Sequence, residues 1–128
     1  MKNTFLIVAL FLISNIFVQC DCLRDHHDND LCYEFDRRQC DGDEWSDIVP
    51  LGDSADDQET KMKAYLEDKG IDIEDITLVQ NFHEFVCEAC VVCPQGDRFF
   101  IQIVDEEDVN ILEELELLNF EEAACNNL

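Results

Sequence analysis

Cysteine is the residue that most constrains what this chain folds into, and its meaning depends on the first twenty residues. The chain has eight cysteines among 128 residues. Residues 1–20 carry one lysine near the start, then an apolar run, then a cleavage position that suits a signal peptidase before Asp21. An exported chain meets an oxidising environment in which thiols pair. The sequence therefore predicts a secreted, disulfide-stabilised product of about 108 residues, the size of one small domain.

Removal of residues 1–20 leaves an odd number of cysteines. These seven disulfide candidates are Cys22, Cys32, Cys40, Cys87, Cys90, Cys93 and Cys125. An odd number leaves one thiol free or bonded to a second chain, so a disulfide-linked dimer is one expectation. Cleavage after Ser14 instead of after Cys20 would keep Cys20 as an eighth partner. The spacing selects no connectivity among these possibilities.

The second constraint is charge. The chain has 31 acidic and 8 basic residues, a formal net charge of -23, which becomes -24 when Lys2 is removed with the leader. Such a surface repels nucleic-acid backbones and anionic membranes. We therefore expect no nucleic-acid partner and no membrane association after cleavage, and we expect electrostatic attraction to a basic extracellular protein.

Composition divides the mature chain into an acidic, loop-rich, cysteine-containing arm over 21–53 and an α+β core domain over 54–128. The first helix is predicted over 54–69, where Ser54 caps the first turn and Gly70 follows the last. Acidic residues stand in its first turns and lysines in its later ones, as the helix dipole favours. Its apolar stripe consists of Met62, Tyr65 and Leu66.

The sequence after Gly70 changes from helical to strand-like periodicity. Residues 71–73 and 76–92 are rich in β-branched and aromatic side chains, which predicts strands. Pro94–Asp97 is predicted to be the turn of a hairpin, whose return strand over 98–104 is apolar on both faces and needs cover on both. A final helix is predicted over 106–118. The expected fold is a helix, then an antiparallel sheet that contains the hairpin, then a C-terminal helix.

Two clusters of metal-ligand residue types stand in the chain. Cys87, Cys90 and Cys93 are each three residues apart, a spacing seen in zinc and iron–sulfur sites of reducing compartments. Export favours disulfides there instead. The run 25–30 brings His26 and His27 between carboxylates, but adjacent histidines seldom reach one ion. We therefore predict no metal and no cofactor site, and we interpret His83 as a strand residue beside a carboxylate.

Two short motifs resemble calcium-dependent families without the spacing that their sites need. His27-Asp28 followed by Cys32-Tyr33 resembles the His-Asp-x-Cys-Tyr run of secreted phospholipases, with two extra residues before the cysteine. The run 40–43, Cys-Asp-Gly-Asp, is similar to the calcium-binding end of low-density-lipoprotein receptor class A modules, which need two more cysteines soon afterwards. No glycine has the acidic ligands of an EF-hand loop around it. Because the spacing of this chain departs from that of these families, we expect no dedicated calcium site.

The functional expectation follows by exclusion. The chain shows no nucleophile with a base and an orienting group, no Gly-x-Ser-x-Gly elbow and no phosphate-binding loop, so catalysis is not expected. We expect a secreted, non-catalytic acidic protein that binds an extracellular partner in an effector, venom-type, signalling or inhibitor role. The alternatives are an acidic extracellular matrix protein that associates weakly with calcium through its many carboxylates, and an enzyme of a type without a recognisable motif.

Overall fold

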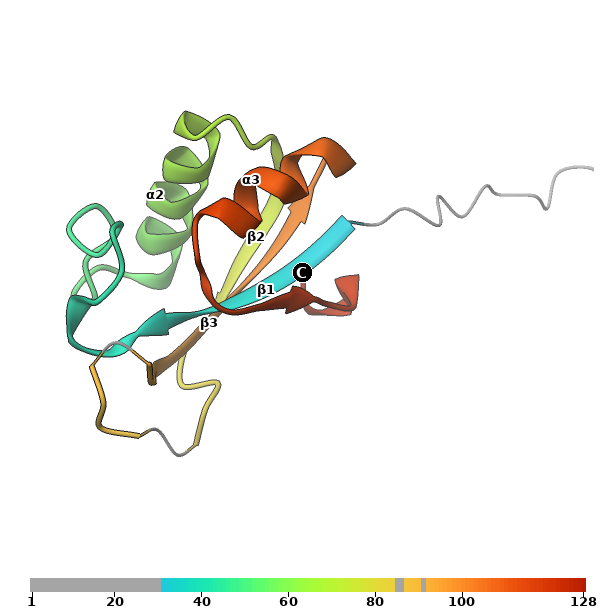
Figure 1. Ribbon diagram of the computed structural model, residues 1–128. Helices are drawn as coiled ribbons and strands as arrows, with labels where there is room; N and C mark the ends of the chain where they lie inside the picture. The colour runs from blue at the N-terminus through green and yellow to red at the C-terminus, as the bar shows by residue number, and fades with distance from the viewer. Residues whose placement is uncertain (1–30, 85–86, 91) are drawn as a thin grey trace, which may run out of the picture.

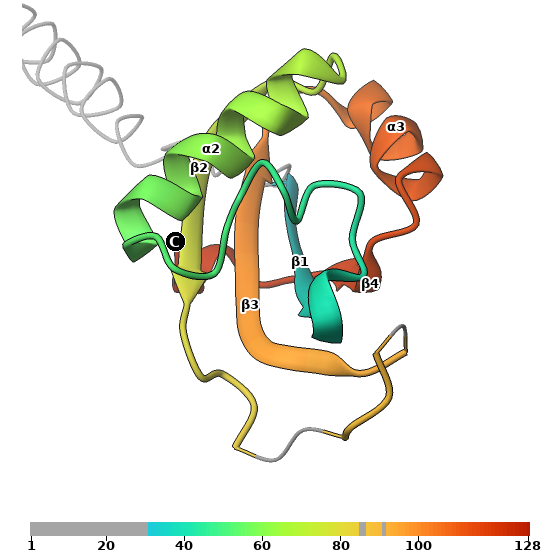
Figure 2. The same cartoon turned by 90° about the vertical axis from the view of Figure 1, so that its left-hand side faces the viewer.

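The computed structural model describes residues 31–84, 87–90 and 92–128. An antiparallel four-stranded sheet has the order β2-β3-β1-β4, with β1 at Leu31–Arg38, β2 at Ile73–Val79, β3 at Pro94–Ile103 and β4 at Leu118–Glu122. Helices α2 (Ala55–Asp68) and α3 (Val109–Glu114) both lie on one face of it (Figures 1 and 2). Short 3-10 turns η1, η2 and η3 occupy Gln39–Asp41, Glu106–Asp108 and Cys125–Asn127. The predicted α+β class is confirmed.

Helix α2 forms where its end signals predict it. The Ser54 hydroxyl accepts a hydrogen bond from the backbone N–H of Asp57 at 3.2 Å, which satisfies one of the unpaired donors of the first turn. Gly70 follows with φ of 92°, a conformation that suits glycine. The predicted apolar stripe is buried against the sheet together with Gln58. The prediction of this helix is confirmed.

The predicted order of elements is wrong, because among the described residues strand β1 precedes helix α2. Residues 31–38, which we assigned to the loop-rich arm, form β1 in the interior of the sheet, paired with both β3 and β4. The alternation of Phe35 toward the helices and Asp36 toward the other face is the pattern of a strand. The charged residues of this segment made it resemble a loop in composition, so the strand was not predicted. The strands that pair with it lie at the other end of the chain.

The predicted hairpin turn is also misplaced. Pro94–Asp97 belongs to β3, and Pro94 pairs with Arg38 at a register shift, where a missing N–H is tolerated. Strand β2 ends at Val79, so the described residues of 80–92 are not strand. Strands β2 and β3 are still sequential antiparallel neighbours, connected by residues 80–93, whose described part we call the 80–93 loop.

The predicted helix over 106–118 is shorter and begins differently. The 3-10 turn η2 precedes α3, the α-helix ends at Glu114, and Leu118 already belongs to β4. Glu116 has φ of 49°, which stops helical hydrogen bonding. The helix has carboxylates on its outer face, and no basic residue lies in its first or last turn to balance them. Its stability therefore depends on the packing of the buried Leu112 against the sheet.

The core fills the space between the helices and one face of the sheet. Its largest aromatic contacts join Phe35 to Phe99, with ring centroids 5.2 Å apart, and both to Trp45. Trp45 comes from the loop before α2, so the acidic first half contributes to the core as well. On the opposite face of the sheet, Phe100 is buried beside Phe82 of the 80–93 loop.

Three disulfides connect the described cysteines, which confirms the disulfide-stabilised character of the chain. The bonded pairs are Cys32–Cys125, Cys40–Cys90 and Cys87–Cys93. All six cysteines of the described residues are therefore paired with one another. Cys22 lies outside these residues and has no partner left among them. Within the same residues, no helix is long and apolar enough to cross a membrane.

Candidate functional site

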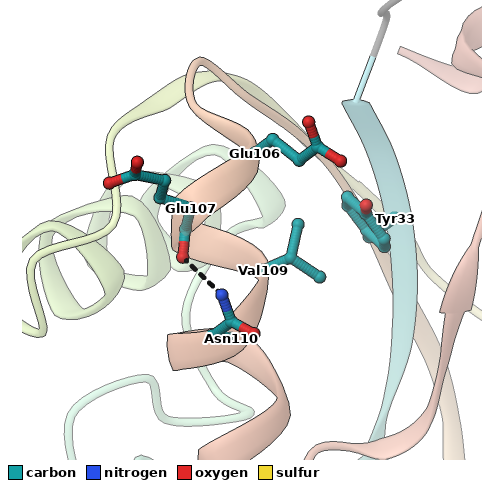
Figure 3. A pocket seen from close by; sticks show the side chains of 5 residues that line it. All are labelled: Tyr33, Glu106, Glu107, Val109 and Asn110. Atoms are coloured by element: carbon teal, nitrogen blue, oxygen red, sulfur yellow. Dashed lines mark hydrogen bonds between the residues drawn. The ribbon is translucent and has the colours of Figure 1, made fainter.

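A cleft of about 410 Å³ opens beside β1, between this strand and the segment that leads into α3. Its lining residues are Tyr33, Glu106, Glu107, Val109 and Asn110. Figure 3 shows the Glu106 carboxylate and the Val109 side chain turned toward Tyr33. A volume of this size matches that of a small-ligand site, about 300–1,000 Å³.

Three elements build this cleft. Tyr33 points to the helix side of β1, where its ring stacks on Phe120 of β4 at a centroid distance of 5.2 Å. The acidic turn η2 places Glu106 and Glu107 at the rim, and Asn110 Nδ2 donates to the carbonyl oxygen of Glu107 at 3.3 Å. Packing of Val109 against the core fixes the start of α3. The Tyr33 ring, the Val109 side chain and the Glu106 carboxylate therefore meet in one concave surface, whereas the Glu107 carboxylate points away from Tyr33 (Figure 3).

The electrostatic environment of the cleft is negative. Burial raises the pKa of the Tyr33 phenol, and the carboxylates of Glu122, Glu106 and Glu113 raise that pKa further. The part of this shift that comes from the three carboxylates reports a negative potential at the phenol, which disfavours an anion there and favours a cation. The cleft is thus suited to a positively charged group.

The basic side chains of the described residues all have partners elsewhere. They are Arg37, Arg38, Lys61, Lys63, Lys69 and Arg98. Their respective partners include Gln58, Asp43, Asp53, the carbonyl oxygen of Glu74, the ring of Tyr65 and Asp36. Since none of the six lines the cleft, its charge is not neutralised by a basic side chain of the described part of the chain.

A second polar cluster lies on the face of the sheet opposite the helices. Asp36, fully buried, accepts hydrogen bonds from Arg98 Nε at 2.7 Å, Arg98 Nη2 at 3.0 Å and Asn119 Nδ2 at 2.6 Å. His83 Nε2 lies 2.9 Å from the same carboxylate. Arg98 also pairs with Glu34. We call Asp36, Arg98, His83, Asn119 and Glu34 the Asp36 network, which joins β1, β3, β4 and the 80–93 loop.

The Asp36 network makes the free energy of unfolding depend on pH. Burial by itself raises the pKa of Asp36, but hydrogen bonds from Arg98, Asn119 and His83 outweigh it and hold the pKa below its usual range. A carboxyl whose pKa is lower in the folded state contributes stability that is complete above its unfolded-state pKa of about 3.9. That contribution is lost as the pH falls through the folded-state value.

We therefore expect the difference in unfolding free energy between the wild type and Asp36→Asn to shrink as the pH falls below about 4. Urea unfolding at a series of pH values measures it. A difference that is unchanged down to pH 2 would show that Asp36 is not the titrating group.

The structure places the candidate residues from the sequence analysis in different environments. The cysteines 87, 90 and 93 are in disulfides, and among the described residues no group of three or more His, Cys, Asp or Glu side chains could hold a metal ion. His83 is in a loop, not in a strand, and its carboxylate partner is Asp36. The run 25–30 and Cys22 lie outside the described residues.

Sequence reasoning missed the cleft. Tyr33 and Glu106 are far apart along the chain, and neither belongs to a motif. The signal that was present is the alternation of apolar and charged residues over 31–36, which marks Tyr33 as a strand residue on the core side.

The chain was also compared with protein-family models, with curated proteins and with solved structures, and none of the three comparisons found a match.

Proposed function

We propose that this chain is exported and acts without catalysis, by binding an extracellular partner through a basic side chain that enters the cleft at Tyr33. The three disulfides support the extracellular location, since such bonds persist in oxidising compartments. The observation that carries the proposal is the concave, negatively charged surface that no basic side chain of the described residues occupies. An effector, venom-type, signalling or inhibitor role is compatible with this mode of binding.

The chemistry of the cleft favours an organic cation over a metal ion. The methylene groups of a lysine or arginine side chain can pack on Val109, while the charged end faces Glu106 and the Tyr33 ring. A cation near an aromatic face gains about 0.5–1 kcal/mol when exposed and about 2 kcal/mol when desolvated. Metal sites instead need several converging ligands, and the described residues offer no such group. Calcium association remains the alternative prediction.

Two observations support a role without catalysis. His83, the only histidine of the described residues, contacts Asp36 and Arg98 and is therefore part of an ion-pair network. The six cysteines of the same residues are bonded in pairs, so none of them is a thiolate nucleophile while the bonds are closed.

Binding of the blocked amino acid N-acetyl-arginine methylamide tests this proposal. We expect about millimolar affinity, with the largest changes in backbone amide chemical shift at Tyr33, Val109 and Asn110, and weaker binding at high salt. The citrulline analogue has nearly the same shape without the charge and serves as the matched ligand. Glu106→Gln is expected to weaken binding of the arginine compound severalfold.

Glu74→Gln is the matched control variant, because Glu74 is exposed on β2 and does not line the cleft. It should bind the arginine compound as the wild type does. Equal shifts with arginine and citrulline, or shifts that cluster away from the cleft, would rule out a cation site at Tyr33.

A further inference from the structure

The Cys40–Cys90 disulfide differs from the Cys32–Cys125 disulfide in its surroundings. Cys40 and Cys90 are both exposed, and they join the turn after β1 to the 80–93 loop. Cys32 is buried, with 1% of its surface exposed, and connects β1 to the end of the chain. A thiol in solution can therefore approach the first bond more readily than the second.

The backbone at one end of this exposed bond is strained. Cys40 has φ of 57° and Asp41 has φ of 52°, so two consecutive residues with side chains occupy the left-handed region. That region is unfavourable for residues other than glycine and persists only where surrounding constraints impose it. The disulfide is one of these constraints, so its opening lets the turn relax and favours the open form.

Opening of this bond leaves the other attachments of the loop in place. The backbone N–H of Gln39 donates to the carbonyl oxygen of Cys93 at 2.9 Å, and its side-chain Nε2 donates to that of Cys87 at 3.2 Å. The Cys87–Cys93 disulfide also stays closed and ties Cys87 to the residue that precedes β3. Neither Cys40 nor Cys90 belongs to the hydrophobic core. The sheet and helices can therefore stay folded when the bond opens.

We propose that Cys40–Cys90 is a thiol–disulfide exchange site, which takes an external thiol as its reaction partner while Cys32–Cys125 remains closed. The thiolate attacks Cys90 Sγ, a new sulfur–sulfur bond forms there, and the Cys40–Cys90 bond breaks. The electron pair of the broken bond leaves on Cys40 Sγ, which takes a proton from water. The reverse step is attack of the Cys40 thiolate on Cys90 Sγ, which re-forms the Cys40–Cys90 bond, breaks the mixed disulfide and releases the external thiolate. Both a small thiol and a cysteine of a partner protein have the required chemistry, and the site is independent of the Tyr33 cleft.

The test equilibrates the oxidised protein in glutathione buffers of increasing reducing strength, followed by alkylation and peptide mass spectrometry. We expect alkylated Cys40 and glutathionylated Cys90 at buffer ratios where Cys32 and Cys125 are still bonded. The thermal unfolding transition of that species should remain cooperative. Adding thioredoxin whose resolving cysteine is replaced distinguishes a protein thiol from a small thiol as the partner. If a protein thiol reacts, this variant is trapped on Cys90 as a mixed disulfide.

A pair of glycine variants tests the role of backbone strain. Asp41→Gly relieves the left-handed strain in the closed form and should shift the exchange equilibrium toward the closed bond by about fivefold or more. Glu116→Gly relieves an equally left-handed residue, with φ of 49°, outside the disulfide-bonded turn and should leave the equilibrium unchanged. The wild-type experiment is decisive without the variants. Opening of Cys32–Cys125 first, or loss of all three bonds in one step with unfolding, would overturn the proposal.

Discussion

Replacement of Asp36 with asparagine is expected to lower the free energy of unfolding by about 3–5 kcal/mol at neutral pH. The variant keeps the size of the side chain but removes the negative charge that Arg98 needs. Arg98 is only 8% exposed, so its guanidinium would be left largely out of water with Glu34 as its nearest remaining counter-charge. The asparagine amide would also place a donor among groups that donate. Urea unfolding at pH 7 measures the change.

Glu121→Gln is the matched control for this experiment. The Glu121 carboxylate lies 3.9 Å from Arg98, but its side chain is 64% exposed, and exposed ion pairs contribute about 0–1 kcal/mol. A small loss in Glu121→Gln beside a large loss in Asp36→Asn would assign the stabilisation to the buried pair. Losses of equal size in the two variants would contradict our account of the Asp36 network.

Removal of the Cys32–Cys125 disulfide, as the double variant with alanine at both positions, is expected to cost about 4–5 kcal/mol. The bond closes a loop with a sequence separation of 93, and the entropy of the unfolded chain that a disulfide removes grows with loop length. It also holds the last residues beside β1, where the backbone N–H of Ala123 donates to the carbonyl oxygen of Cys32 at 2.8 Å. Denaturant unfolding under non-reducing conditions measures the loss.

The short Cys87–Cys93 disulfide provides the comparison. Its sequence separation is 6, for which the same chain-entropy relation gives about 2 kcal/mol. The double alanine variant at these two positions should therefore be clearly more stable than the one at 32 and 125. If the two double variants are equally stable, loop length does not govern what these bonds contribute.

The sequence predicts those parts of the fold whose signals are local. Helix α2 has a capping serine, a buried stripe and a terminal glycine within one short segment, and its predicted bounds agree with the structure to within one residue at each end. The class of the fold follows in the same way, from a helical period that changes to an alternating one at Gly70.

What the sequence does not predict depends on contacts between distant segments. Strand β1 is stabilised by pairing with β3 and β4, and the charges of Asp36 and Glu34 are balanced by Arg98, more than sixty residues away. Propensity alone also places a turn at Pro94–Asp97, because proline and glycine favour turns, whereas tertiary pairing holds the same residues in β3. The Tyr33 cleft arises only after β1 and the turn η2 are brought side by side.

The order of the strands also determines when the protein can fold during its synthesis. Strand β1 is the first of the described strands to be made, yet both of its neighbours, β3 and β4, begin at residue 94 or later. A ribosome that has not yet passed residue 93 has therefore produced the interior strand β1 without either partner. The pairs of β1 can therefore form only after residues beyond 94 have been made, and until then the unpaired strand is a target for chaperones and for aggregation.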